Sequence, residues 1–125
     1  MENMFFEATK YTPEITLDAN GKLISLKGKS YPENTFDFYE PIVAWLKNYF
    51  AEPKEGVSIV FDISYFNSSS SKLFFDIFDI FEEAAQGGNT LSIKWVYDAD
   101  NESAQEAGED FKDDFEGLDF ELVEK

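Results

Sequence analysis

The amino-acid sequence predicts an α/β fold: a single compact domain in which a mixed β-sheet packs with about three helices. Two observations lead to this prediction. Hydrophobic residues switch several times between the period of strands and the period of helices, and no linker-like stretch interrupts residues 1–125. With 43% hydrophobic residues and fourteen phenylalanines, the chain has enough apolar surface for a sizeable core. Strands that alternate with helices imply right-handed crossovers within one domain.

The first half of the chain predicts strands followed by a helix. Residues 14–17 and 22–27 are short alternating runs, and Asn20-Gly21 between them is a strong hairpin signal. A further strand is expected near residues 5–9. From 35 to 50, apolar residues recur at intervals of three and four, which is typical of an amphipathic helix. Pro41 should lie near its first turn or kink it.

The second half predicts three more strands and two more helices. Residues 57–63 (VSIVFDI) are nearly continuous in β-branched and aromatic residues, which favours a central strand covered on both faces. The next helix should end at Gln86-Gly87-Gly88, where glycine suits the cap. Two adjacent apolar stripes run along this helix, one formed by Leu73, Ile77, Ile80 and Ala84 and the other by Phe74, Phe78 and Phe81. The remaining predicted elements are a strand at 90–97, a helix at 102–111 and a weaker strand at 119–123.

Composition excludes several classes of function. The net charge of −16 repels nucleic acid phosphates and anionic lipid surfaces, so we expect neither nucleic acid nor a membrane as a partner. The chain contains no cysteine or histidine, and every basic residue is a lysine. Zinc sites built from Cys and His, thiolate nucleophiles, histidine bases and arginine fingers are therefore excluded. No stretch resembles a signal peptide or a membrane span, so we expect a cytoplasmic protein without a cofactor.

Four consecutive serines occupy the stretch YFNSSSSK, residues 65–72, between a predicted strand and a predicted helix. Asn67 or Ser68 is suited to be the N-cap of that helix, and capping alone explains such a run. A helix N-terminus also has free N–H groups and the positive end of the helix dipole, which favour a phosphate. A phosphate adds a charge of about −1.5 to −2, which would alter any docking surface there. The residues alone leave both interpretations open.

Several unusual blocks resemble the SiaC family of regulatory phosphoproteins: EATKYTPEI (7–15), GKSYPENTFDFYEPI (28–42), YFNSSSSK (65–72), and W-x-Y-D (95–98) leading into EAGEDF (106–111). The resemblance implies a compact α/β fold similar to the anti-sigma-factor antagonist (STAS-like) domains, and no catalytic activity. It also implies a role in a partner-switching module. In such a module a protein kinase adds a phosphate, a PP2C-type phosphatase removes it, and the unphosphorylated form activates a diguanylate cyclase in cyclic-di-GMP signalling and biofilm regulation.

The resemblance places the phosphoacceptor directly after the Asn of the YFN block, at Ser68, where serine stands in place of the typical threonine. A phosphate on Ser68 is expected to weaken effector binding through charge repulsion and the cost of desolvation. The other three serines of the run are alternative acceptors. The predicted environment of the phosphosite is Asn67, Ser69, Ser70, Ser71 and Lys72.

The stretch SYPENTFDFYEP, residues 30–41, supports two interpretations. It can be a loop that enters a helix capped by Asn34 or Thr35, or the carboxylates of Glu33, Asp37 and Glu40 can belong to a hydrolase site. Its aromatic residues cannot all lie on the buried face of a helix, so an exposed aromatic surface is expected. The predicted partner-binding residues are Tyr31, Glu33, Asn34 and Phe38.

The last 28 residues, 98–125, contain twelve acidic residues and only two lysines. Such a surface suits a basic patch on a partner. The spacing of Asp98, Asp100, Glu102, Glu106 and Glu109 also imitates an EF-hand calcium loop, although Ser103 stands where that loop needs glycine. An acidic metal- or small-molecule-binding domain that uses the carboxylates between Asp98 and Glu109 is therefore the alternative function.

Overall fold

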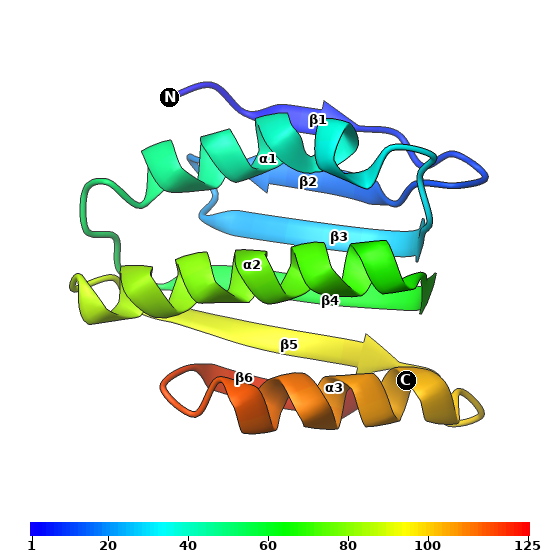
Figure 1. Ribbon diagram of the computed structural model, residues 1–125. Helices are drawn as coiled ribbons and strands as arrows, with labels where there is room; N and C mark the ends of the chain where they lie inside the picture. The colour runs from blue at the N-terminus through cyan, green and yellow to red at the C-terminus, as the bar shows by residue number, and fades with distance from the viewer.

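The computed structural model describes all 125 residues as one α/β domain with six strands and three helices (Figure 1). The strands are β1 (Met4–Phe6), β2 (Glu14–Asp18), β3 (Leu23–Ser30), β4 (Val57–Phe66), β5 (Leu91–Tyr97) and β6 (Asp119–Glu124). The helices are α1 (Thr35–Tyr49), α2 (Ser68–Gln86) and α3 (Glu102–Asp114). No helix combines the length and the apolar character needed to cross a membrane.

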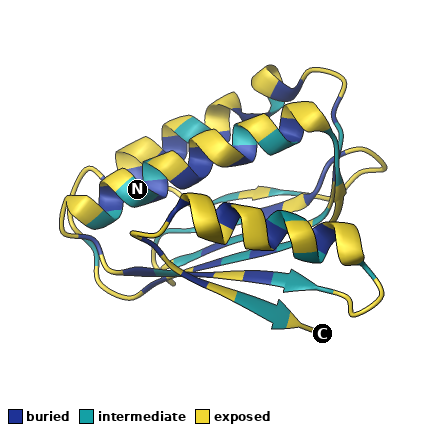
Figure 2. Cartoon of the chain, turned by 60° about the horizontal axis from the view of Figure 1, so that its bottom comes forward, coloured by how far each residue is buried: buried dark blue, intermediate teal, exposed yellow.

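The strands lie in the sheet in the same order as in the chain, β1 to β6. The pairs β1–β2 and β2–β3 are antiparallel, whereas the pairs β3–β4, β4–β5 and β5–β6 are parallel. Each parallel pair is joined by one helix. Because right-handed crossovers that all advance in one direction place their helices on the same side, the three helices cover one face of the sheet (Figure 2).

The sheet is buried on its helical face alone. Along β4, Val57, Ile59, Phe61 and Ile63 are buried, and the residues between them are exposed or half-buried. The prediction that this strand is covered on both faces is therefore wrong. All three crossover helices lie on one side of the sheet, so Val60 faces away from them. Its apolar side chain makes this position look buried in the sequence.

Aromatic rings fill the space between the helices and the sheet. Phe61 and Trp95 stack at 5.9 Å between ring centroids, and Phe78 packs against both rings. Trp95 also donates a hydrogen bond from its indole nitrogen to the carbonyl oxygen of Ala104 in α3, at 2.9 Å. This contact ties the third helix to the centre of the core, where an unpaired indole N–H would be costly.

Every predicted helix and strand is present, and the differences concern where they end. The first strand covers Met4–Phe6 and stops before residue 9, and α3 extends beyond residue 111 to Asp114. The start of α2 at Ser68 agrees with a cap at Asn67. Pro41 lies inside α1, on its exposed side. The architecture is consistent with the STAS-like fold that the family resemblance implies.

Candidate functional site

The serine run lies at the edge of the sheet where β3 and β4 end and where α1 and α2 begin (Figure 1). Asn67 is the N-cap of α2, and its side-chain oxygen accepts a hydrogen bond from the backbone N–H of Ser70 at 2.9 Å. Ser68 is therefore the first residue of the helix. The capping interpretation of the run is confirmed, with Asn67 in the capping position.

The four serines have different surroundings. Ser68 and Ser69 are exposed and Ser71 is half-buried, but Ser70 has a relative exposure of 0%. The hydroxyl of Ser70 is therefore accessible from solvent only if the first turn of α2 opens. Among the predicted acceptors, Ser68 and Ser69 have freely accessible hydroxyls.

The hydroxyl of Ser70 belongs to a buried hydrogen-bonded group. Ser30 Oγ lies 2.8 Å from Ser70 Oγ and 2.6 Å from the hydroxyl oxygen of Tyr39. Burial raises the pKa of Tyr39 far above its ordinary value, and the hydrogen bond with Ser30 offsets this only in part. The phenol consequently stays protonated in the folded protein.

Ser68 opens onto a cleft of about 530 Å³ between α2 and α3. The cleft carries three carboxylates and one cation, Lys72, which lies one helical turn after Ser68. A phosphate on Ser68 would thus have Lys72 as its nearest possible counter-ion in sequence. The lining residues are Ser68, Ser71, Lys72, Phe75, Asp76, Ala107, Asp110, Phe111 and Asp114.

Three tyrosines form an aromatic row at the same edge. Tyr31 makes edge-to-face contacts with Tyr11 and Tyr65, with ring centroids at 5.3 and 5.5 Å. Tyr11 and Tyr65 are 51% and 53% exposed. Tyr31, one of the predicted partner-binding residues, is half-buried and contacts both of these exposed rings. Its contact with Tyr65 places it close to the end of β4.

The structure places the other predicted partner-binding residues at the start of α1. Asn34 caps the helix by accepting a hydrogen bond from the N–H of Asp37 at 3.1 Å, which confirms the capped-helix interpretation of this stretch. Glu33 is exposed. Phe38 is half-buried between Phe6 and Tyr39, and the exposed ring of this helix is instead Phe36, at 65%.

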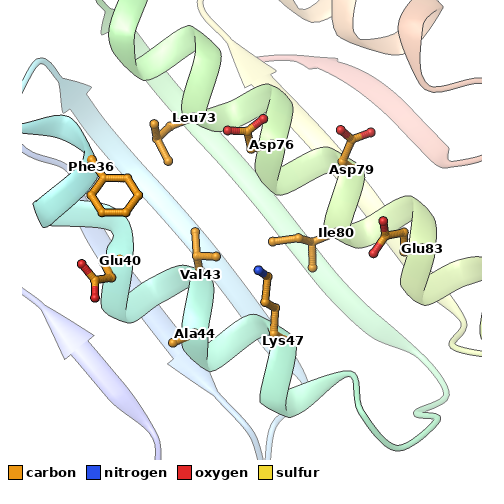
Figure 3. A pocket seen from close by; sticks show the side chains of 10 residues that line it. All are labelled: Phe36, Glu40, Val43, Ala44, Lys47, Leu73, Asp76, Asp79, Ile80 and Glu83. Atoms are coloured by element: carbon orange, nitrogen blue, oxygen red, sulfur yellow. The ribbon is translucent and has the colours of Figure 1, made fainter.

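A groove of about 570 Å³ runs between α1 and α2, and Figure 3 shows the side chains that line it from both helices. Its apolar part consists of Phe36, Val43, Ala44, Leu73 and Ile80, and its charged part of Glu40, Lys47, Asp76, Asp79 and Glu83. None of these charged groups forms an ion pair within the chain, since the ion pairs present involve Lys125 with Asp62 and Asp98. The groove is thus an acidic surface with an apolar floor.

Sequence reasoning missed this groove because it arises only when two helices lie side by side. In the sequence, Leu73 and Ile80 belong to the same apolar stripe of α2 as the buried residues Ile77 and Ala84, so all four look like core residues. In the structure Leu73 and Ile80 are only half-buried and face α1.

The carboxylates that suggested calcium binding do not converge. Glu102, Glu106 and Glu109 lie on the continuous helix α3 and not in a loop of the EF-hand kind. No group of three or more acidic side chains in the structure is arranged to hold a metal ion. The carboxylates of this region instead form a solvated acidic face.

Comparison with known proteins finds a matching family and a similar protein. A family model described as SiaC family regulatory phosphoprotein matches residues 6–125. An uncharacterised protein of Pseudomonas aeruginosa strain UCBPP-PA14 is 34% identical over 114 residues, which cover 91% of this chain and 90% of that protein.

Solved structures show the same similarity. SiaC of Pseudomonas aeruginosa superposes with a TM-score of 0.86 at 31% identity, covering 98% of this chain and 97% of that chain. A crystal structure of the diguanylate cyclase SiaD in complex with its activator SiaC from the same organism contains a chain that matches with a TM-score of 0.91. That chain is 32% identical, and the match covers 98% of this chain and 99% of the other.

Proposed function

Because the chain belongs to the SiaC family of regulatory phosphoproteins, we propose that it is a non-enzymatic activator of a diguanylate cyclase, switched by phosphorylation of Ser68. The observation that carries this proposal is the placement of Ser68. It is an exposed residue at the first position of a capped helix, it lines the acidic cleft between α2 and α3, and it follows Tyr65 of the tyrosine row by three positions. A protein kinase and a PP2C-type phosphatase complete the proposed module.

The proposed docking surface combines the α1–α2 groove with the tyrosine row. The three helices contain twelve acidic residues and three lysines, so the helical face attracts a positively charged partner surface. The apolar floor of the groove and the exposed ring of Phe36 provide area that a partner can bury. The predicted contacts of Tyr31, Glu33, Asn34 and Phe38 lie at the end of this surface nearest to Ser68.

Phosphorylation is proposed to act locally. The free amides at the start of α2 and Lys72, one turn away, favour a phosphate on Ser68 in the free protein, so the modification does not unfold the helix. A partner that packs against this edge must strip water from a group with a charge of about −1.5 to −2. The desolvation cost opposes binding even though the surrounding surface attracts basic partners.

The test compares Ser68→Ala with Ser68→Asp in binding to, and activation of, the diguanylate cyclase encoded in the same genome. We expect Ser68→Ala to bind and activate, and Ser68→Asp to bind about tenfold more weakly or worse. Ser103→Asp is the matched control, because Ser103 is an exposed serine in the first turn of α3. Equal binding by the two Ser68 variants would contradict the switch, and an equal loss in Ser103→Asp would show a nonspecific charge effect.

A further inference from the structure

A chain of three hydroxyls, formed by Tyr39, Ser30 and Ser70, connects three elements beneath Ser68. Tyr39 lies on α1, Ser30 ends β3, and Ser70 lies in the first turn of α2. All three residues have 0% relative exposure, and their oxygens follow one another at 2.6 and 2.8 Å. Because a buried hydroxyl without a partner is costly, movement of any one of these groups affects the other two.

Ser70 is the point where this hydroxyl chain meets the helix cap. Its backbone N–H donates to the side chain of Asn67, while its hydroxyl contacts Ser30. Ser30 in turn accepts a hydrogen bond from the N–H of Asn67 on its carbonyl oxygen, at 3.1 Å. A phosphate on Ser68 carries strong acceptor oxygens next to the same first-turn amides, so it competes with Asn67 for the N–H of Ser70.

The other two hydroxyls are direct sequence neighbours of proposed docking residues. Ser30 precedes Tyr31, and Tyr39 follows Phe38, whose ring contacts the ring of Tyr39 edge-to-face at 4.8 Å between centroids. A shift of the hydroxyl chain therefore reaches both the tyrosine row and the start of α1. Close-packed interiors transmit such shifts because their side chains have few alternative positions.

We infer that Ser30, Tyr39 and Ser70 are positioning residues that couple the charge on residue 68 to the conformation of the docking residues around Tyr31 and Phe38. This inference deepens the proposed function and takes its biological meaning from it. The coupling itself is a property of the free protein and is measured without any partner.

The experiment records amide chemical shifts of the free protein by ¹⁵N NMR for Ser68→Asp and for its neutral isostere Ser68→Asn. In the wild-type background we expect the two spectra to differ at residues 30–31 and 34–39 as well as in the first turn of α2. In the Tyr39→Phe background, which removes the end of the hydroxyl chain, we expect the differences at 34–39 to fall to less than about half. The differences within α2 should persist.

Tyr49→Phe is the matched control, because Tyr49 is also buried on α1 and its hydroxyl donates to the carbonyl oxygen of Ala19 at 3.4 Å, away from Ser70. It should leave the differences at 34–39 unchanged. If Tyr39→Phe does not fold, Ser70→Ala removes the other end of the hydroxyl chain and carries the same test. If the Ser68→Asp and Ser68→Asn spectra differ equally at 34–39 in the wild-type, Tyr39→Phe and Ser70→Ala backgrounds, the charge acts directly through its field and the inference is overturned. The inference is also overturned if the two spectra do not differ at 34–39 in the wild-type background.

Binding to the diguanylate cyclase separates this inference from the proposed function. If the coupling holds, Tyr39→Phe should reduce the loss of affinity caused by Ser68→Asp by about five-fold. A loss of affinity that is present in the wild type and unchanged in Tyr39→Phe and Ser70→Ala would overturn the coupling and leave the switch intact. Shift differences at 34–39 without any loss of affinity would support the coupling and contradict the switch.

Discussion

Gly108 of α3 lies directly against the indole ring of Trp95 on β5: a Cβ atom at position 108 would stand 2.5 Å from Cδ1 and 2.8 Å from Nε1 of that ring. The ring has little room to move, because it packs between Phe61 and Phe111. Glycine is therefore what allows α3 to approach the sheet closely enough for the indole to bond Ala104.

Gly108→Ala should accordingly destabilise the protein, although alanine favours helices. We expect a net loss of about 1–2 kcal/mol in the free energy of unfolding, because overpacking costs more than the helix propensity returns. Urea denaturation measures it. Gly117→Ala is the control: its Cβ would meet only the flexible carboxylate of Glu82, at 3.2 Å, so it should change stability by less than about 0.5 kcal/mol. Equal effects of the two variants would contradict this account of the contact.

Asparagine caps all three helices, and Asn67 caps the one that begins at Ser68. Asn67→Ala should lower the free energy of unfolding by about 1 kcal/mol, because the N–H of Ser70 loses its acceptor. Asn67→Asp keeps the acceptor and adds a favourable charge, so it should retain stability. Thermal denaturation tests both, with the exposed Asn48→Ala as a control that should show no loss. A harmless Asn67→Ala would refute the role of the cap.

Stability should fall at alkaline pH because of Tyr39. Its pKa is raised by burial in the folded protein, whereas in the unfolded chain it is about 10. Above that pH the unfolded state loses the proton and the folded state keeps it, so stability decreases as pH rises; below it, the group contributes no pH dependence. Tyr39→Phe should therefore flatten the decline measured by urea denaturation between pH about 9 and 11. A decline as steep in Tyr39→Phe as in the wild type would show that Tyr39 is not its source.

Phosphorylation in the native host should depend on which serine is accessible. We expect phosphopeptide mass spectrometry to find the phosphate on Ser68, and Ser68→Ala to remove it. Ser70→Ala should leave it in place, because the Ser70 hydroxyl is buried. A phosphate found only on Ser70 would mean that the first turn of α2 opens before the kinase acts.

The carboxylates of the groove should speed association with the diguanylate cyclase. Neutralising Asp76, Asp79 and Glu83 to their amides should lower the association rate at low salt by about tenfold, and the difference should shrink as salt is added. The control removes the same charge elsewhere, at Asp113, Glu116 and Glu121. Association rates by stopped flow decide the outcome: equal slowing in both triple variants would show that net charge acts, and not the groove.

The order and type of the helices and strands were predictable because each has a clear hydrophobic period. That only one face of the sheet is covered by helices was not predictable, because Val60 is apolar and looks like a core residue in the sequence. Only the common direction of the crossovers shows that it faces outward. The place of Ser68 at the boundary between a strand and a helix was predictable from the sequence. The burial of Ser70 was not predictable, because its partner Ser30 is 40 positions away in sequence. Tyr39, which bonds Ser30, is 31 positions from Ser70, and the three residues meet only in the folded chain.

The identical order of strands in the sheet and in the chain has a consequence for how the protein folds. Every strand pairs with the strand just before it, so each new strand finds its template already formed by residues made earlier in synthesis. Both edge strands of the sheet also disfavour pairing with a strand from another molecule. The first edge, β1, has only three residues, and the last, β6, carries Asp119, Glu121 and Glu124, whose charges oppose the addition of a strand from another molecule.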